Sequence, residues 1–433
     1  MFVACSWRTS ALGLGLLLGI TSSGFAIGAA VGSPALDLRT VLARTLEESP
    51  ALDVFPYRER AADALIVQAG LRPNPELSVE LENVVGTGLY SGFDRAEATF
   101  ALSQVIELGG KRERRTLLAE MNRELAGADY EVARIEVLAE AAQRFISVAL
   151  GQALLKTAQL EERLAERALT VAERRAESGR ASPIDESRAR IAIVQATIAK
   201  SRAQRELASA RIRLAASWGE TNPTFGDVRA DLFRFPEVPP FEFLRARLDD
   251  APTLGRFLTL ERVRAAELRL AESSGRQDAR VGIGLRRFEE SGESAVTLQF
   301  SMPLPFSDRN QGRISAARAE WEMTDAERRQ ARIAIHASLF EIHQELQHAR
   351  AEAAALQEVA LPEAQQALER IESGYEEGRF SYLDLIEARR QRLGIERAAI
   401  EAASSFHRLL LELERLTGEP VVAPPAAATE QEG

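Results

Sequence analysis

Two stretches of this sequence match each other: ESGRASPIDESRAR at residues 177–190 and EEGRFSYLDLIEAR at residues 376–389. Seven positions are identical at a constant separation of 199 residues, which is the distance from Gly179 to Gly378. The identical residues are Glu177, Gly179, Arg180, Ser182, Asp185, Ala189 and Arg190 in the first copy, and Glu376, Gly378, Arg379, Ser381, Asp384, Ala388 and Arg389 in the second. A fixed period indicates an internal repeat, so both halves of the chain are expected to share one fold.

Each glycine lies between two long segments with helical composition, rich in Arg, Glu and Ala. The stretch from Gly110 to Glu177 contains no proline and, at about 1.5 Å per residue, could form a helix of roughly 100 Å. Its apolar positions recur at spacings of three and four: Val132, Ile135, Leu138, Ala142, Phe145 and Ala149. This narrow stripe is typical of helices that pack against neighbouring helices. A generic coiled-coil rod is the competing interpretation, but a tight turn followed by a returning helix favours hairpins.

Before each long helix lies a pair of segments with period-two alternation. Between Glu76 and Glu82, for example, apolar and polar residues alternate strictly, which places them on opposite faces of a strand. The expected strands are about 76–84, 96–106, 279–288 and 294–303, close to the length of a tilted membrane-spanning strand. Two soluble hairpins would show the same pattern. Four strands cannot close a barrel alone, so a barrel requires an oligomer, and a trimer would supply about twelve strands.

The expected organisation is a signal peptide (1–26), a first repeat (37–218), a connector (219–250), a second repeat (251–418) and a disordered tail (419–433). Within the repeats, the long helices are expected at about 110–177, 182–217, 312–376 and 381–417. Each repeat is expected to open with a short helix, entered through Ser49-Pro50 and through Ala251-Pro252. The signal peptide is inferred from Arg8, an apolar core and small residues near Ala26. The only cysteine, Cys5, precedes that core, so neither lipidation nor a disulfide is expected.

Composition and motifs exclude several classes of function. The formal charge is −10 and basic residues are interspersed with Glu, so a nucleic-acid partner is not expected. The sequence lacks a nucleophile elbow, a phosphate loop, a zinc-type Cys/His spacing and a dinucleotide fingerprint, which argues against an enzyme and against a bound cofactor. His336 and His343 could share a helix face, but a solvated face is the stronger interpretation than a metal site.

Three further motifs mark the junctions between strands and helices. They are RPNPEL at 72–77, LSQVIELGGKR at 102–112 and MPLPFSDRNQG at 302–312. With these motifs the sequence resembles the TolC-like outer-membrane factors, and among them the CzcC-like branch that serves heavy-metal efflux. The resemblance covers nearly the whole chain after the signal peptide.

The resemblance implies a mainly α protein with a membrane β-barrel. A homotrimer would form a 12-stranded β-barrel in the outer membrane, continuing into a 12-helix α-barrel that crosses the periplasm. The chain would be a passive exit duct, contacting outer-membrane lipid, a periplasmic adaptor and, through it, an inner-membrane transporter of the resistance-nodulation-division type. Two alternatives stay open: a duct for drugs or other organic solutes, and a periplasmic coiled-coil scaffold protein without a barrel.

The resemblance also assigns roles to the two glycine turns. The adaptor would contact the tips at Gly179, Arg180, Ser182, Gly378, Arg379 and Ser381. The periplasmic gate would use Asp384, Glu387, Tyr375 and Asp185, with Arg188 in place of a second carboxylate in the first repeat. Phe380 occupies a position where the family can carry a bonding arginine, so that arginine contact is not expected. Capping of the returning helices would explain Ser182 and Ser381 equally well.

Overall fold

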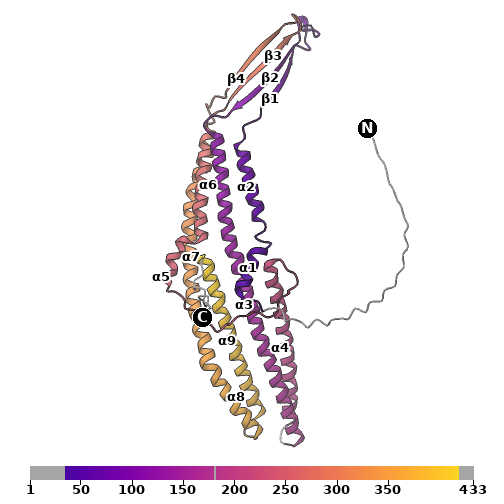
Figure 1. Ribbon diagram of the computed structural model, residues 1–433, viewed down its shortest axis with the longest axis vertical. Helices are drawn as coiled ribbons and strands as arrows, with labels where there is room; N and C mark the ends of the chain where they lie inside the picture. The colour runs from indigo at the N-terminus through magenta and orange to yellow at the C-terminus, as the bar shows by residue number, and fades with distance from the viewer. Residues whose placement is uncertain (1–34, 180–181, 419–433) are drawn as a thin grey trace, which may run out of the picture.

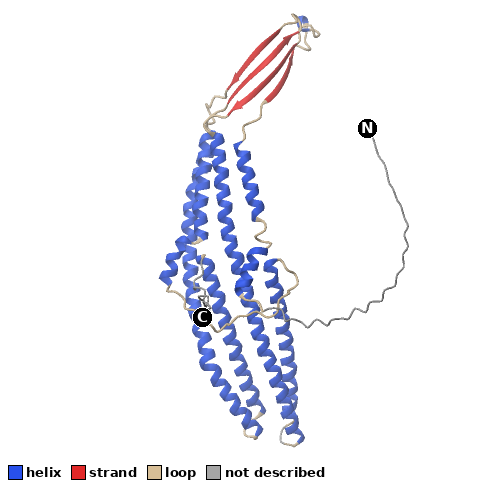
Figure 2. Cartoon of the chain, in the orientation of Figure 1, coloured by secondary structure: helices blue, strands red, loops and turns tan. Residues whose placement is uncertain are grey.

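The computed structural model describes residues 35–179 and 182–418, and it shows an elongated molecule (Figure 1). A small β-sheet forms one end, long helices run from it along the molecule, and two helical hairpin turns form the opposite end (Figure 2). The expected signal peptide and tail lie outside the described residues. Within the described ranges, no helix combines the length and the apolar character that crossing a membrane requires.

One antiparallel sheet of order β1-β2-β3-β4 unites the strands of both halves of the chain. The strands are β1 (Glu76–Glu82), β2 (Glu97–Ile106), β3 (Ala279–Phe288) and β4 (Ser294–Ser301). Both hairpins therefore lie side by side, with Phe100 of β2 opposite Leu285 of β3. On one face most apolar side chains are exposed, as at Leu298. The other face carries polar side chains, and Arg286 there pairs with Glu82 and Glu97 at 2.9 Å.

Long helices form the rest of the molecule. The first half contains α1 (Leu38–Glu48), α2 (Phe55–Gly70), α3 (Lys111–Glu177), α4 (Pro183–Ala215) and the short 3-10 turns η1 (Gly88–Tyr90) and η2 (Ala216–Trp218). The second contains α5 (Phe241–Arg247), η3 (Leu248–Asp250), α6 (Pro252–Ser274), α7 (Gln311–Ala355), η4 (Leu356–Ala360), α8 (Leu361–Glu376) and α9 (Tyr382–Thr417). Because α3 is longest, it packs against α2 and α6 near the sheet and against α4 and α9 near the tips.

Two helix predictions are wrong in detail. The helix expected over 312–376 is interrupted by η4, a π-helical turn. Pro362 is the second residue of α8, directly after this turn. Because proline has no N–H to donate to the carbonyl four residues earlier, the regular series of α-helical hydrogen bonds cannot continue there. The first short helix is not entered through Ser49-Pro50, which lies in turns after α1. Instead α2 begins at Phe55, and Pro56 takes the first-turn position.

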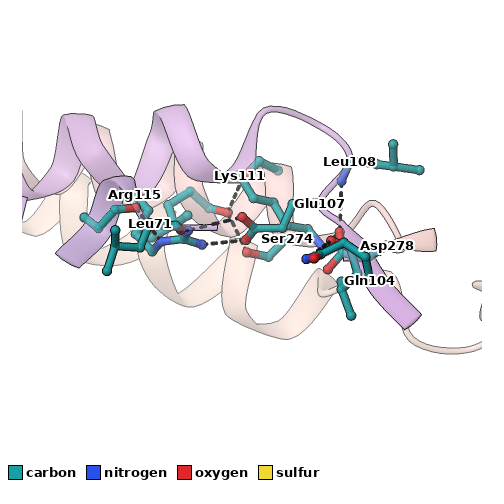
Figure 3. A network of polar contacts seen from close by, with 12 residues as sticks. Leu71, Gln104, Glu107, Leu108, Lys111, Arg115, Ser274 and Asp278 are labelled. Atoms are coloured by element: carbon teal, nitrogen blue, oxygen red, sulfur yellow. Dashed lines mark hydrogen bonds and ion pairs between the residues drawn. The ribbon is translucent and has the colours of Figure 1, made fainter. Parts of the chain in front are cut away.

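The junction between sheet and helices is held by ion pairs (Figure 3). Gly109 and Gly110 adopt φ of 78° and 71°, which turns the chain from β2 into α3. One carboxylate oxygen of Asp278 accepts from the Leu108 amide at 3.0 Å and from Lys111 Nζ at 2.8 Å. Because Asp278 comes from the second repeat and the other two groups from the first, this contact ties the repeats together where strand becomes helix.

The connector crosses the middle of the helices (Figure 1). Phe235 contacts Phe406 of α9 with ring centroids 5.0 Å apart, and Phe241 contacts Phe340 of α7 at 5.3 Å. The expectation of a solvated face at His336 and His343 is wrong for His343, which is only 4% exposed. The connector covers that side of α7, so a position that a helix pattern alone leaves open to water becomes part of the interior.

Candidate functional site

The two glycine turns lie together at the end of the molecule remote from the sheet (Figure 1). Gly179 follows α3 with φ of 67°, and Gly378 follows α8 with φ of 85°. Both values lie in the left-handed region, which glycine adopts without a side-chain clash. The turns are therefore built on glycine for a backbone reason. Arg180 lies outside the described residues.

The serines that follow the turns cap the returning helices. Ser182 Oγ accepts from the Ile184 amide at 3.2 Å, and Ser381 Oγ accepts from the Asp384 amide at 3.2 Å. At Ser381 the cap is reciprocal, because an Asp384 carboxylate oxygen accepts from the Ser381 amide at 2.9 Å and from its hydroxyl at 2.7 Å. The hydroxyl contact and then the amide contact hold the pKa of Asp384 below its usual value. Asp384 is exposed and anionic, but its carboxylate also stabilises the start of α9.

The other charged candidates lie at the surface of the tips. Glu387 is exposed, and its carboxylate is 3.6 Å from Arg390 one turn later. Asp185 is similarly 3.6 Å from Arg188, so the first repeat carries an ion pair where the second carries Asp384 and Glu387. Arg379 is exposed and pairs with Glu377 at 2.5 Å. These loosely held charges can contact a partner or an ion without first losing a buried interaction.

Tyr375 is placed differently from the acidic residues, because it is 2% exposed and lies between the hairpins. Its ring centroid is 5.8 Å from that of Tyr382. Burial raises the pKa of Tyr375 and raises that of Tyr382 to about 12, so both are neutral phenols. The Arg175 guanidinium lies 4.5 Å from the Tyr375 ring centroid and also donates a hydrogen bond to the Tyr375 carbonyl. Tyr375 thus belongs to the contact between the two hairpins.

A second arginine makes the reverse connection. Arg389 of α9 donates to the Leu164 carbonyl of α3 at 2.7 Å, and its other nitrogens donate to Glu372 of α8 at 2.6 and 3.1 Å. Arg175 reaches from the first hairpin to the second and Arg389 from the second to the first, so we call these two residues the arginine clamp. A cavity of about 220 Å³ lies beside the clamp, between α3, α4 and α9.

The sequence prediction missed the clamp. Arg389 belongs to the repeated stretch, but its counterpart Arg190 is 64% exposed and makes ion pairs only within its own hairpin. Arg175 has no counterpart, because Gly374 stands 199 residues later. A comparison of the copies finds what they share, whereas the clamp depends on where they differ. Within residues 35–179 and 182–418, no three His, Cys, Asp or Glu side chains are grouped as metal ligands.

Comparisons with known proteins agree with one another. The family model described as "Outer membrane efflux protein" matches residues 41–220 and 266–419. The chain is 32% identical to the cobalt-zinc-cadmium resistance protein CzcC of Cupriavidus metallidurans over 352 residues, which cover 80% of this chain and 82% of that protein. It is 30% identical to the nickel-cobalt-cadmium resistance protein NccC of Alcaligenes xylosoxydans xylosoxydans, over 71% of this chain and 68% of the relative.

Solved structures share the fold at lower sequence identity. The channel CusC superposes with a TM-score of 0.73 at 16% identity, covering 91% of this chain and 96% of its own. The outer membrane protein VceC of Vibrio cholerae superposes with a TM-score of 0.72 at 18% identity, covering 89% and 96%. The mainly α architecture with one antiparallel sheet, expected from the sequence, is confirmed.

Proposed function

The chain belongs to the outer membrane efflux protein family, and from this premise we propose that it is the exit duct of a tripartite pump that expels heavy-metal cations. As a member of this family it is an efflux channel protein of the outer membrane with a periplasmic extension, and it is not an enzyme. The observation that carries the choice of metal cations is the match, over about four fifths of both chains, to a cobalt-zinc-cadmium resistance protein.

The proposed assembly is a homotrimer. Family members are trimeric channels that work with an adaptor and a transporter. In this chain β1 and β4 are the edge strands of the sheet, and each pairs on one side only, so strands of other copies are needed to pair with them. The apolar face of the sheet is exposed, and lipid is needed to cover it. On α4 the side chains of Ile184, Ile191 and Ile198 recur every seven residues and are about 60% exposed. Such a stripe suits a neighbouring helix, and we assign that helix to a second copy.

Each copy would contribute two repeats, 37–218 and 251–418, joined by the connector 219–250. Three copies would then give the 12-stranded β-barrel and the 12-helix α-barrel. The adaptor would dock on the tips, at Gly179, Arg180, Ser182, Gly378, Arg379 and Ser381. Support comes from Gly179 and Gly378, which are exposed and leave the backbone of the turns accessible to a partner, and from the exposed charge of Arg379. The energy source would be an inner-membrane transporter of the resistance-nodulation-division type.

The gate would use the exposed carboxylates of Asp384 and Glu387 and the half-buried carboxylate of Asp185. Three copies would bring these groups close to one another, and like charges repel while they attract cations. The arginine clamp and Tyr375 would hold each pair of hairpins in register behind those carboxylates. In this proposal Tyr375 positions the gate and does not face the permeating ion.

Deleting the gene tests the function directly. Loss of the duct should lower tolerance to cobalt, zinc or cadmium, and a plasmid copy should restore it. New sensitivity to drugs with unchanged metal tolerance would favour the organic-solute duct instead. Heat-modifiable trimers in the outer-membrane fraction would support a barrel, whereas a wholly soluble protein would favour the periplasmic scaffold.

A sharper test separates charge from capping at the gate. Because Asp384 also caps α9, we choose Glu387→Gln, which removes one exposed charge without a cap. In purified trimers this variant should lower the preference for cations over anions. Glu377→Gln, an exposed carboxylate in the turn itself, is the matched control. Equal effects of the two variants would show that overall charge matters and that no gate lies at Glu387.

A further inference from the structure

Histidines are rare in this chain, and most of them meet the connector. The sequence holds four, and three of these contact connector aromatic rings. The ring centroids of His336 and His343 on α7 lie 5.5 and 5.9 Å from that of Phe241. The ring of His407 on α9 stacks on Phe235 at 6.3 Å. The proposed duct assigns no role to any of them.

Two of these histidines hold the connector backbone by hydrogen bonds. His407 Nε2 is 3.0 Å from the Leu232 carbonyl, and His343 Nε2 is 3.3 Å from the Pro239 carbonyl. A carbonyl only accepts, so Nε2 carries the proton in both rings, and in the neutral ring Nδ1 carries none. Nδ1 of His343 is buried and has no hydrogen-bond partner among the described residues. A proton there would be an unpaired charge in the interior.

The surroundings of the His407 ring favour its neutral form. Leu339, Leu346, Phe406 and Leu410 form the buried cluster around this part of α7 and α9. Burial lowers the pKa of His407, outweighing the Leu232 carbonyl and the Asp231 carboxylate, which act in the opposite direction.

The other charged groups near the connector are engaged elsewhere or exposed. On the first-repeat side, Asp227 pairs with Arg211 at 2.6 Å, while Lys156 of α3 and Asp231 line one open cavity. On the second-repeat side, Glu242 of α5 pairs with Arg245 at 2.8 Å. Glu237 of the connector and Glu341 and Glu345 of α7 are exposed. Asp231 is thus the carboxylate that acts on His407.

The connector is fastened to the first repeat in another way. Leu36 donates to the Asp227 carbonyl at 3.1 Å and accepts from the Arg229 amide at 2.9 Å, forming a parallel bridge beside Val228. The Val228 amide donates to a Gln152 side-chain oxygen of α3 at 3.1 Å. Backbone and amide groups do not titrate near neutral pH. The connector therefore has a pH-independent attachment at one end and histidine attachments at the other.

We propose that the connector is a proton-sensitive strap: His407, with the hydrogen bond of His343 beside it, fastens the connector to the second repeat at neutral pH, and protonation in acid releases it. When pH falls below the ordinary histidine value, the unfastened state binds protons that the fastened state excludes, so fastening weakens. Above that value both states are neutral and fastening is complete. Release would remove one link between α3 on one side and α7 and α9 on the other, because the connector contacts both sides.

Hydrogen exchange in the intact trimer tests the strap. Amides of residues 232–248 should be at least about tenfold less protected at about pH 5 than at about pH 7.5, after correction for intrinsic exchange, while those of α3 near Gln152 stay unchanged. His343→Gln combined with His407→Gln should abolish this difference, since a glutamine amide can donate to a carbonyl but does not titrate. His348→Gln, on the same helix but 79% exposed, should retain it.

Equal protection of residues 232–248 at both pH values in the wild-type protein would overturn the proposal. So would a pH difference that survives in the double glutamine variant. If that variant does not assemble, each single variant is measured instead. The strap would then be refuted if neither single variant reduces the difference in protection between the two pH values. Hydrogen exchange is measured without any ion conduction. The strap can therefore fail this test while the chain still acts as a duct, and the two failures are distinguished.

Discussion

The arginine clamp allows a quantitative prediction from matched positions in the two repeats. Arg389 is 15% exposed and holds the Leu164 carbonyl and Glu372, whereas Arg190, at the same place in the first repeat, is 64% exposed. Replacing Arg389 with methionine keeps the apolar stem and removes the guanidinium. The variant Arg190→Met makes the same chemical change where no contact between hairpins exists.

The expected cost follows from the contacts that each variant loses. The hydrogen bond from the charged Arg389 to a carbonyl contributes about 1.5 to 3 kcal/mol. Its ion pair with the partly exposed Glu372 lies within the second hairpin, so this pair does not oppose separation of the two hairpins. A loss of about 2 kcal/mol from the Leu164 hydrogen bond would raise the equilibrium constant for separating the hairpins about 30-fold. The exposed pairs of Arg190 contribute less than about 1 kcal/mol, and both pairs lie within the first hairpin.

Hydrogen exchange of purified trimers measures this separation. Amides of α8 and the first half of α9 should exchange about 30-fold faster in Arg389→Met than in the wild type, and single-channel recordings should show more frequent opening. Arg389→Lys should be intermediate, because one ammonium cannot hold both acceptors in the same geometry. Similar acceleration in Arg389→Met and Arg190→Met would refute the clamp, as would no acceleration in either.

Three further predictions concern the sheet, its junction and the tip. Gly284→Ala should reduce the yield of heat-modifiable trimers, because the added Cβ would lie 2.6 Å from Thr297 Oγ1 and 2.9 Å from a backbone oxygen. Gly127 has open space around it, so Gly127→Ala should leave the yield unchanged. Asp278→Ala should destabilise the junction by about 1 to 3 kcal/mol in denaturant unfolding, and Asp278→Asn should recover part of that loss by keeping an acceptor for the Leu108 amide. The Asp384 cap is complete above the ordinary carboxylate pKa and is lost as pH falls through the lowered pKa of Asp384 in the folded protein. Hydrogen exchange in the first turn of α9 should therefore accelerate in acid in the wild type but not in Asp384→Asn.

The features that the sequence predicted well are those encoded by local pattern. Period-two alternation predicted all four strands, and β3 has the expected ends, while β1 ends at Glu82, two residues early. The absence of proline from 110–177 predicted the whole of α3. The prediction of one helix over 312–376 passes through Pro362 and misses the π-helical turn just before it. Periodicity reports which face is apolar, and it is insensitive to one widened turn.

The candidate site was predicted only in its local parts. The capping roles of Ser182 and Ser381 follow from residues within one turn, and the structure contains both caps. Arg175 and Tyr375 are 200 positions apart, and no local pattern links a guanidinium to a distant carbonyl. The burial of His343 was missed for the same reason, since the connector that covers it lies about a hundred residues earlier in the chain.

The open sheet has a consequence for biogenesis. A single chain leaves two strand edges and a broad apolar surface uncovered, so the membrane portion has no stable form at infinite dilution. Its formation then depends steeply on how many chains are present together, and a cell that produces few copies would accumulate unassembled subunits for proteases and chaperones to remove. The amount of assembled channel should stay low below a threshold expression level and rise steeply above it, rather than increase in proportion to expression.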